Sequence, residues 1–254
     1  MPSASLDPAE VAKFSKLAAE WWDPKGAFAP LHALNPARLE IIRDEARARA
    51  AAPAGAKPLA GLSILDIGCG GGLVSVPLTR LGARVTGLDA SQEAIAAARL
   101  YAEEAGLAIE YRAGTVEALA DELADKFDLV LALEIVEHVA DVATFLGACA
   151  ALVRPGGKLI VSTLNRTHKA RALAVFAAER ILHWAPIGTH DYEKFVTPEE
   201  LAYAAPDLDW QEPVGLRFDP LSRQWRRSKD VDVNYVRVAR KREEKTRVTR
   251  SSRS

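Results

Sequence analysis

The stretch Leu65-Asp66-Ile67-Gly68-Cys69-Gly70-Gly71-Gly72 decides the fold of this chain. It closes a short aliphatic run over residues 63–67 and opens a segment with helical spacing near residues 73–81. Glycines are needed at such a turn because the backbone turns tightly and must let a ligand approach without an intervening Cβ. The spacing is G-x-G-x-G, and the third glycine that a dinucleotide fingerprint requires, at position 73, is a leucine. The turn therefore predicts a ligand-binding α/β unit and disfavours a nicotinamide dehydrogenase.

After this turn the sequence alternates between short aliphatic runs and helical segments. The expected strands cover residues 84–88, 108–111, 127–133 and 158–163, with helices over 91–105 and 141–153. Strands that are apolar without clean alternation and are separated by helices indicate a parallel sheet covered on both faces. We therefore predict an α/β fold with a doubly wound, mostly parallel, Rossmann-like sheet, which binds its ligand at the carboxyl ends of the strands.

Further elements flank the predicted sheet. Asp7-Pro8-Ala9-Glu10 has the features of a helix start and predicts a helix over residues 7–21, and Asn35-Pro36 is expected to open a second helix. A long helical stretch over 168–184 and a helix from Thr197 precede two late strands, near 210–218 and 231–238. The expected parts are an N-terminal helical extension and linker (1–60), a main domain (61–238) with a helical insertion (166–196) after the fifth strand, and a basic tail (239–254).

The composition narrows the class of protein. A chain of 254 residues, 26% charged and 49% hydrophobic, is typical of an ordinary globular protein. The only two cysteines, Cys69 and Cys149, exclude a disulfide framework or a cysteine-rich zinc site and fit a reducing compartment. No apolar run reaches the roughly 18–20 residues of a membrane span, and the first ten residues do not form a secretory signal. We therefore expect a cytoplasmic protein.

The net charge of −1 conceals an asymmetry. Residues 237–254 carry eight Lys/Arg against two Glu, a balance of +6 that leaves −7 on the rest of the chain. Such a tail is either a solvated, disordered segment or one with affinity for anionic surfaces. It has no aromatic residue on which bases could stack, which disfavours nucleic acid as a partner.

Asp89 ends the second expected strand, about 20 residues beyond the glycine turn, where a carboxylate can accept the hydroxyls of a bound ribose. The alternative is that Asp89 only caps the helix that opens at Ser91. Because strand, turn, helix, strand and acid follow in register, we favour binding of a nucleoside.

Glu134, Glu137 and His138 follow the fourth expected strand. If this segment is helical, the three side chains share one face and could hold a hard divalent cation such as Mg²⁺. Alternatively, the two acids orient the loop and His138 is a base or a structural hydrogen-bonding group. Both interpretations stay open.

Several segments resemble the ubiquinone biosynthesis O-methyltransferase family, whose members are class I methyltransferases that use S-adenosylmethionine. The resemblance covers nearly everything from Phe14 to Val238. Besides the glycine turn and Glu134-x-x-Glu137-His138, its motifs are Trp21-Trp22-Asp23, Pro30-Leu31-His32, Asn35-Pro36-x-Arg38, Ser162-Thr163-Leu164-Asn165-Arg166, Gly188-Thr189-His190-Asp191 and Val231-Asp232-Val233-Asn234-Tyr235.

The resemblance implies which residues bind the cofactor, S-adenosylmethionine. These are Arg38, Gly68, Asp89 and Leu133, to which we add Asp66 and Gly70 of the turn; many family members have methionine where this chain has Leu133. No acid stands near the end of the third strand to flank the adenine, so Thr115 and Val116 are the candidates there. Glu134, Glu137 and His138 match positions linked to magnesium in mitochondrial relatives.

The implied reactions are O-methylations of ring hydroxyls on a 2-polyprenyl-6-hydroxyphenol and on 3-demethylubiquinol. A catechol hydroxyl has a pKa of ~10, so only about one in a thousand is ionised at neutral pH. Either a cation lowers that pKa or a base takes the proton. His138 and Glu137 are therefore the catalytic candidates, with His138 as the base where no metal acts.

The resemblance also implies partners. A polyprenylated phenol or quinol sits in a membrane, so residues 168–184 and the tail are expected to bind an anionic surface, giving peripheral association with the inner face of the cytoplasmic membrane. Other enzymes of ubiquinone biosynthesis are candidate partners, and nucleic acid is not. The alternatives are an O-, C- or N-methyltransferase of the same fold with a different, soluble substrate and, more remotely, a nucleic-acid-binding module that uses the tail.

Overall fold

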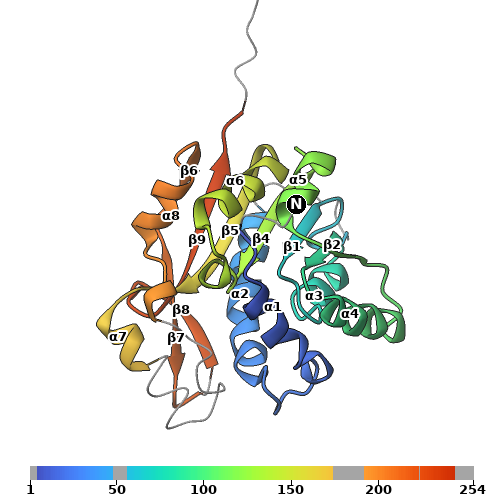
Figure 1. Cartoon of the computed structure of the whole chain (residues 1–254), viewed down its shortest axis with the longest axis horizontal. Helices are drawn as coiled ribbons and strands as arrows, with labels where there is room; N and C mark the ends of the chain where they lie inside the picture. The colour runs from blue at the N-terminus through green and yellow to red at the C-terminus, as the bar shows by residue number, and fades with distance from the viewer. Residues whose placement is uncertain (1–4, 48–55, 174–191, 223, 244–254) are drawn as a thin grey trace, which may run out of the picture.

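A single mixed sheet organises the computed structural model, which describes residues 5–47, 56–173, 192–222 and 224–243 (Figure 1). Within these ranges the strand order is β3-β2-β1-β4-β5-β9-β7-β8, and β6 also pairs with β9. The strands are β1 (Ser63–Ile67), β2 (Arg84–Asp89), β3 (Glu110–Ala113), β4 (Phe127–Leu133), β5 (Val153–Leu164), β6 (Leu208–Trp210), β7 (Val214–Asp219), β8 (Gln224–Ser228) and β9 (Asn234–Lys241).

The strands β1 to β5 are parallel to one another, and β6 to β9 extend the sheet beyond β5 in antiparallel pairs. The chain runs outward from β1 through β2 to β3, then returns to β4 on the other side of β1. The strand order thus reverses between β1 and β4, where open α/β sheets bind ligands. The predicted doubly wound sheet with its parallel core is confirmed.

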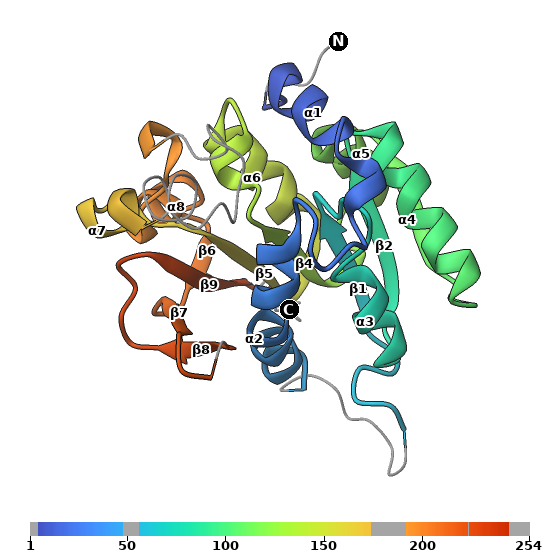
Figure 2. The same cartoon turned by 90° about the horizontal axis from the view of Figure 1, so that it is seen from below.

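Helices cover both faces of the sheet. They are α1 (Pro8–Ser15), α2 (Ala29–Arg47), α3 (Ser75–Arg80), α4 (Gln92–Glu104), α5 (Val116–Leu123), α6 (Val142–Leu152), α7 (His168–Ala170) and α8 (Pro198–Ala204). Figure 2 shows α2 and α6 on opposite sides of β4 and β5. None of the helices in the described ranges has both the length and the apolar composition needed to span a membrane.

Two hydrophobic clusters explain how the helices are held. In β4, Leu129 and Leu131 belong to the cluster with α2 and α3, whereas Val130 and Ala132 belong to the cluster with α5, α6 and α8. Every residue of β4 is buried. An apolar run broken only by Asp128 fits a strand covered on both faces, which is why the sequence pattern located β4 at its observed bounds.

The N-terminal helices differ from the prediction. The first α-helix ends at Ser15 and is followed by a 3₁₀ turn, Ala18–Glu20. The second begins at Ala29, so the expectation that Asn35-Pro36 opens it is wrong. Pro36 lies exposed inside α2 while Leu34, Ala37 and neighbouring side chains are buried. Burial of this apolar face offsets the backbone hydrogen bond that an internal proline removes.

Other elements were not predicted, have bounds that differ from the predicted ones, or lie partly outside the described residues. The sequence did not predict α5 or β8. The basic tail was expected from residue 239, but β9 continues to Lys241 and pairs there with β6. Of the expected helix over 168–184, the structure describes α7 and the residues up to 173, and the remainder lies outside the described residues.

Candidate active site

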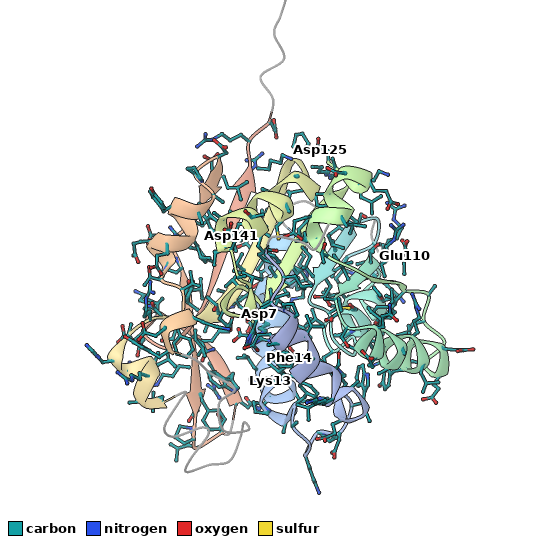
Figure 3. All side chains as sticks on the ribbon, in the orientation of Figure 1. Asp7, Lys13, Phe14, Glu110, Asp125 and Asp141 are labelled. Atoms are coloured by element: carbon teal, nitrogen blue, oxygen red, sulfur yellow. The ribbon has the colours of Figure 1, made fainter. Side chains whose placement is uncertain are left out.

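A cavity of about 190 Å³ lies at the reversal of strand order, at the carboxyl ends of β1, β2 and β4. Its lining also includes residues of α1 and α2 from the N-terminal extension. Figure 3 shows Lys13 and Phe14 on α1, in front of the strands, whereas Glu110 and Asp125 lie at the periphery. Of the predicted site residues, those that line this cavity are Arg38, Asp66, Gly68, Asp89, Leu133, Glu134 and His138, together with the adenine candidates Thr115 and Val116.

The backbone of the glycine turn adopts conformations that favour glycine. Gly68 has a φ of +67° and Gly70 a φ of +52°, in the left-handed region that glycine adopts without steric cost. A Cβ on Gly68 would lie 2.5 Å from Cδ1 of Ile135, and one on Gly70 would collide with the ring of Trp21. The tight turn predicted for these positions is therefore observed, and the groups that a Cβ would meet are the side chains of Ile135 and Trp21.

Asp89 connects the turn to the second strand. Its Oδ2 accepts a hydrogen bond of 2.8 Å from the Gly70 N–H, and its Oδ1 accepts one of 2.8 Å from the Ser91 N–H. The N-cap of α4 is Ser91 itself, whose hydroxyl accepts from the Ala94 N–H. Asp89 thus fixes the glycine turn to the second strand, and the N-cap of α4 is Ser91 instead. Burial raises the pKa of its carboxyl, against the effect of the backbone hydrogen bonds.

Asp66 lies at the bottom of the site. It is buried, and its Oδ2 accepts a hydrogen bond of 2.6 Å from the Ser75 hydroxyl at the start of α3. Burial raises the pKa of Asp66 to about 6, with a smaller contribution from the negative charge of Asp89. Asp66 is therefore a carboxylate at neutral pH whose charge is incompletely compensated by its protein neighbours.

Arg38 and Glu134 form a pair across the cavity. The Arg38 Nη2 lies 2.9 Å from Oε1 of Glu134, which also accepts a hydrogen bond of 2.7 Å from the Ser162 hydroxyl. Glu134 has a φ of +52°, uncommon for a residue other than glycine. Arg38 is buried, and its Nε has no hydrogen-bond partner in the part of the chain that the structure describes. The guanidinium thus has a donor left for an anionic group in the cavity.

Glu137 and His138 do not share a helix face with Glu134. A 3₁₀ turn, Val136–His138, follows Glu134, so the expected α-helical spacing is wrong. Glu137 is buried and accepts a hydrogen bond of 2.9 Å from the Thr163 hydroxyl; burial and the charge of Glu134 raise the pKa of Glu137. In the described ranges, no three His, Cys, Asp or Glu side chains are grouped so that they could hold a metal ion.

Sequence reasoning missed the contact that His138 makes. Its Nδ1 lies 3.1 Å from Oε2 of Glu10, and Phe14 meets the imidazole ring edge-on, with 5.2 Å between ring centroids. Glu10 had been assigned only to the start of the first helix. It stands 128 positions from His138 in sequence, so no local pattern could have paired the two residues.

Two tryptophans hold the N-terminal extension against the glycine turn. The Trp22 indole N–H donates a hydrogen bond of 2.9 Å to the Gly71 carbonyl, and its ring stacks on Tyr101 at 3.4 Å between centroids. Trp21 stacks on Phe28 at 3.6 Å. Trp21-Trp22 appeared among the family motifs, but the sequence assigned it no role. The N-terminal extension thus forms part of the cavity wall, next to the glycine turn.

Comparisons with known proteins agree with this geometry. A family model described as a methyltransferase domain matches residues 65–161. The chain is 53% identical over 241 residues to a ubiquinone biosynthesis O-methyltransferase of Rhizobium leguminosarum, covering 94% of this chain and 95% of that protein. It is 52% identical over 243 residues to the protein of the same name from Caulobacter vibrioides, covering 94% and 96%.

Solved structures support the fold at lower identity. A SAM-dependent methyltransferase from Aquifex aeolicus aligns with a TM-score of 0.59 at 15% identity, covering 92% of this chain and 98% of that one. A protein from Pyrococcus horikoshii aligns with a TM-score of 0.60 at 16% identity, covering 91% and 99%. Together with the family model, these likenesses confirm the predicted fold of the class I methyltransferase type.

Proposed function

The chain belongs to the ubiquinone biosynthesis O-methyltransferase family, and we propose that it methylates ring hydroxyls of polyprenylated phenols with S-adenosylmethionine as donor. The two acceptors are a 2-polyprenyl-6-hydroxyphenol and 3-demethylubiquinol. The observation that carries the proposal is one cavity lined by Gly68 of the glycine turn and Asp89 together with Arg38, Glu134 and His138. Residues suited to bind the donor and a candidate acid–base group therefore line the same space.

The cofactor is proposed to lie along the carboxyl ends of β1 and β2. Asp89 accepts hydrogen bonds from the ribose hydroxyls, and Gly68 lets the backbone approach the amino-acid part of the cofactor. Gly70 contributes by donating its N–H to the Asp89 carboxylate. The free donor of Arg38 suits the cofactor carboxylate, and the carboxylate of Asp66 favours its ammonium group. The remaining contacts are Leu133 beside the cofactor and Thr115 and Val116 beside the adenine.

His138 is proposed to take the proton from the acceptor hydroxyl as the methyl group moves. The phenolic oxygen attacks the methyl carbon in line with the departing sulfur, so the enzyme must hold both groups on one axis. The carboxylate of Glu10 at Nδ1 orients the imidazole ring and stabilises its protonated form. Glu137, buried beside this group with a raised pKa, keeps the floor of the site polar without adding a full second negative charge next to Glu134.

The magnesium prediction does not fit the donors as they are arranged. The guanidinium of Arg38 already stands beside Glu134, and Glu137 is turned toward Thr163. No step of the proposed mechanism therefore uses a metal. Activity measured after chelation and after added Mg²⁺ tests the prediction directly, and a strict requirement for Mg²⁺ would mean that these side chains rearrange.

A membrane contact remains part of the proposal because the substrate is a lipid. Residues 168–184, which mix aromatic and aliphatic side chains with cations, and the basic tail are the candidate contacts with anionic headgroups. We propose a cytoplasmic protein that associates peripherally with the inner face of the membrane, where other enzymes of ubiquinone biosynthesis are candidate neighbours.

The test is transfer of a labelled methyl group to a short-chain demethylubiquinol, compared with a panel of catechols that lack a prenyl tail. We expect transfer to the prenylated acceptor with a kcat/KM at least about tenfold above that for the tailless catechols, which corresponds to ~1.4 kcal/mol from the apolar contact. Equal or better turnover of a tailless catechol would favour the alternative of a methyltransferase with a soluble substrate.

A further inference from the structure

A second cavity, of about 620 Å³, lies between α1 and the segment over residues 27–31 that leads into α2. Most of its wall is apolar and comes from this N-terminal extension. The floor is polar and is formed by Glu134, Glu137 and His138. The apolar part includes Ala12, Phe14, Leu17, Ala27, Phe28 and Leu31.

The two cavities share a wall. Phe14, Leu31, Glu134 and His138 line both of them, whereas Asp89 and the glycine turn line only the smaller one. His138 is thus accessible from either side, with its Nδ1 held by Glu10 and its ring against Phe14. A methyltransferase needs its donor and acceptor in adjoining spaces that meet at the group that accepts the proton.

We propose that this second cavity is the acceptor site, which takes an aromatic ring with its hydroxyl at the Glu134–His138 end and the first isoprene units along α1. This assignment rests on the proposed function and names its substrate subsite. A cavity of about 150 Å³ holds a benzene ring, so about 620 Å³ leaves room for a branched apolar substituent beside the ring. Phe14 and Leu31 border both the acceptor and the cofactor, and Leu17 and Phe28 contact the tail.

A residue that lines the second cavity alone provides the test. Ala12 is exposed on α1 and does not line the cofactor cavity, so Ala12→Trp fills the proposed acceptor site from the solvent side without entering a core. Ala33→Trp is the matched control, because Ala33 is also exposed on a helix of the extension but lines neither cavity. Leu17→Ala tests the opposite change, a larger cavity with less contact.

We expect Ala12→Trp to raise KM for a short-chain demethylubiquinol by about tenfold or more and Leu17→Ala to raise it by a few-fold, since loss of ~1.4 kcal/mol of contact corresponds to tenfold. The affinity for S-adenosylmethionine, measured by calorimetry without acceptor, should stay unchanged in both variants. The control Ala33→Trp should change neither quantity. An Ala12→Trp variant that is folded and keeps the wild-type KM overturns the assignment.

Photolabelling separates failure of this assignment from failure of the proposed function. A prenylated phenol with a diazirine in its first isoprene unit should label residues 9–17 and 27–31 in the wild-type protein, whether or not the ring is methylated. Labelling there without turnover supports the acceptor site and contradicts the proposed reaction. Turnover with labelling confined to other segments supports the reaction and overturns this acceptor site.

Discussion

Asp89 is the single residue on which the cofactor site depends most. Its carboxylate accepts a hydrogen bond from the Gly70 N–H, and we propose that it also accepts hydrogen bonds from the ribose hydroxyls. We expect Asp89→Ala to weaken binding of S-adenosylmethionine by about 10- to 100-fold, because loss of charged or buried hydrogen bonds costs about 1–3 kcal/mol. Asp89→Asn, which keeps an acceptor for the Gly70 N–H, should lose less affinity for S-adenosylmethionine. Calorimetric titration measures both, and an unchanged affinity in folded Asp89→Ala would contradict the site.

The buried carboxyl of Asp66 predicts a pH dependence of stability. Its pKa is raised from 3.8 to about 6, so the folded protein holds the proton more tightly than the unfolded chain does. The contribution of Asp66 to stability is therefore complete below pH 4 and is lost as the pH rises through 6. The variant Asp66→Asn has no such titration.

The measurement is the free energy of unfolding of wild type and Asp66→Asn by denaturant titration between pH 4 and 7. The wild-type value minus the variant value should fall by up to about 3 kcal/mol across this range, given 1.36 kcal/mol for each unit by which the pKa moves. The same comparison with Asp121→Asn, at an exposed position, gives the baseline. A difference that does not change with pH would show that Asp66 is not buried as described.

At the scale of elements, the attachment of the N-terminal extension to the glycine turn is open to a direct test. Trp22 makes two separable contacts, the hydrogen bond to the Gly71 carbonyl and the stack on Tyr101. Trp22→Phe removes the hydrogen bond and keeps an aromatic ring, so we expect a loss of about 1 kcal/mol in stability. Trp22→Ala removes both contacts and should cost about 2–4 kcal/mol.

Both Trp22 variants should also bind S-adenosylmethionine more weakly, in the same order, because the turn that they loosen is the floor of the cofactor cavity. Denaturant titration measures the stability of each variant, and calorimetry measures its affinity for S-adenosylmethionine. If Trp22→Ala lost stability but bound the cofactor as wild type does, the extension would be attached to the turn without helping to shape it.

The elements that the sequence predicted well are those with a local signal. β4 is apolar at every position except Asp128, and α4 and α8 begin at residues whose side chains cap them. β8, Gln224–Ser228, has almost no apolar pattern because it is a partly exposed edge strand. The start of α2 was misplaced because proline indicates a boundary locally, whereas burial on both sides of Pro36 decides the helix.

The same distinction applies to the site. The glycine turn and Asp89 could be predicted because about 20 residues of sequence contain strand, turn and acid together. The contact between Glu10 and His138 and the shared wall at Phe14 join segments more than 120 positions apart, and only the packing of α1 over β4 creates them. The left-handed backbone at Glu134, which keeps the three candidate metal ligands off a single α-helical face, has no signal in the residue type.

At the scale of the whole molecule, the N-terminal extension and the central sheet together form the two proposed binding cavities, and we call this unit the catalytic body. Cofactor and acceptor cavities both lie between α1, α2 and the carboxyl ends of the central strands, so the extension must be in place for either to exist. β9 pairs with β5 along its length and ends at Lys241. Truncation after Glu243 therefore leaves in place every strand of the described residues.

The charge of the segment after Glu243 predicts how the protein reaches a lipid substrate. Residues 244–254 carry four Lys/Arg against Glu244, and their removal changes the net charge from −1 to −4. Each basic residue near an anionic surface contributes about 1 kcal/mol. We expect a chain that ends at Glu243 to bind vesicles containing anionic lipid at least about tenfold more weakly than the full chain, in a salt-sensitive manner.

Neutral vesicles and a short-chain, water-dispersed demethylubiquinol provide the two controls. The shortened chain should bind neutral vesicles as the full chain does, because the lost contribution is electrostatic, and it should methylate the dispersed acceptor at the full rate, because both cavities are intact. Co-sedimentation and methyl transfer measure these quantities. Unchanged binding to anionic vesicles would exclude the tail as the membrane contact and leave residues 168–184 as the candidate, whereas loss of activity on the dispersed acceptor would show that the tail belongs to the catalytic body.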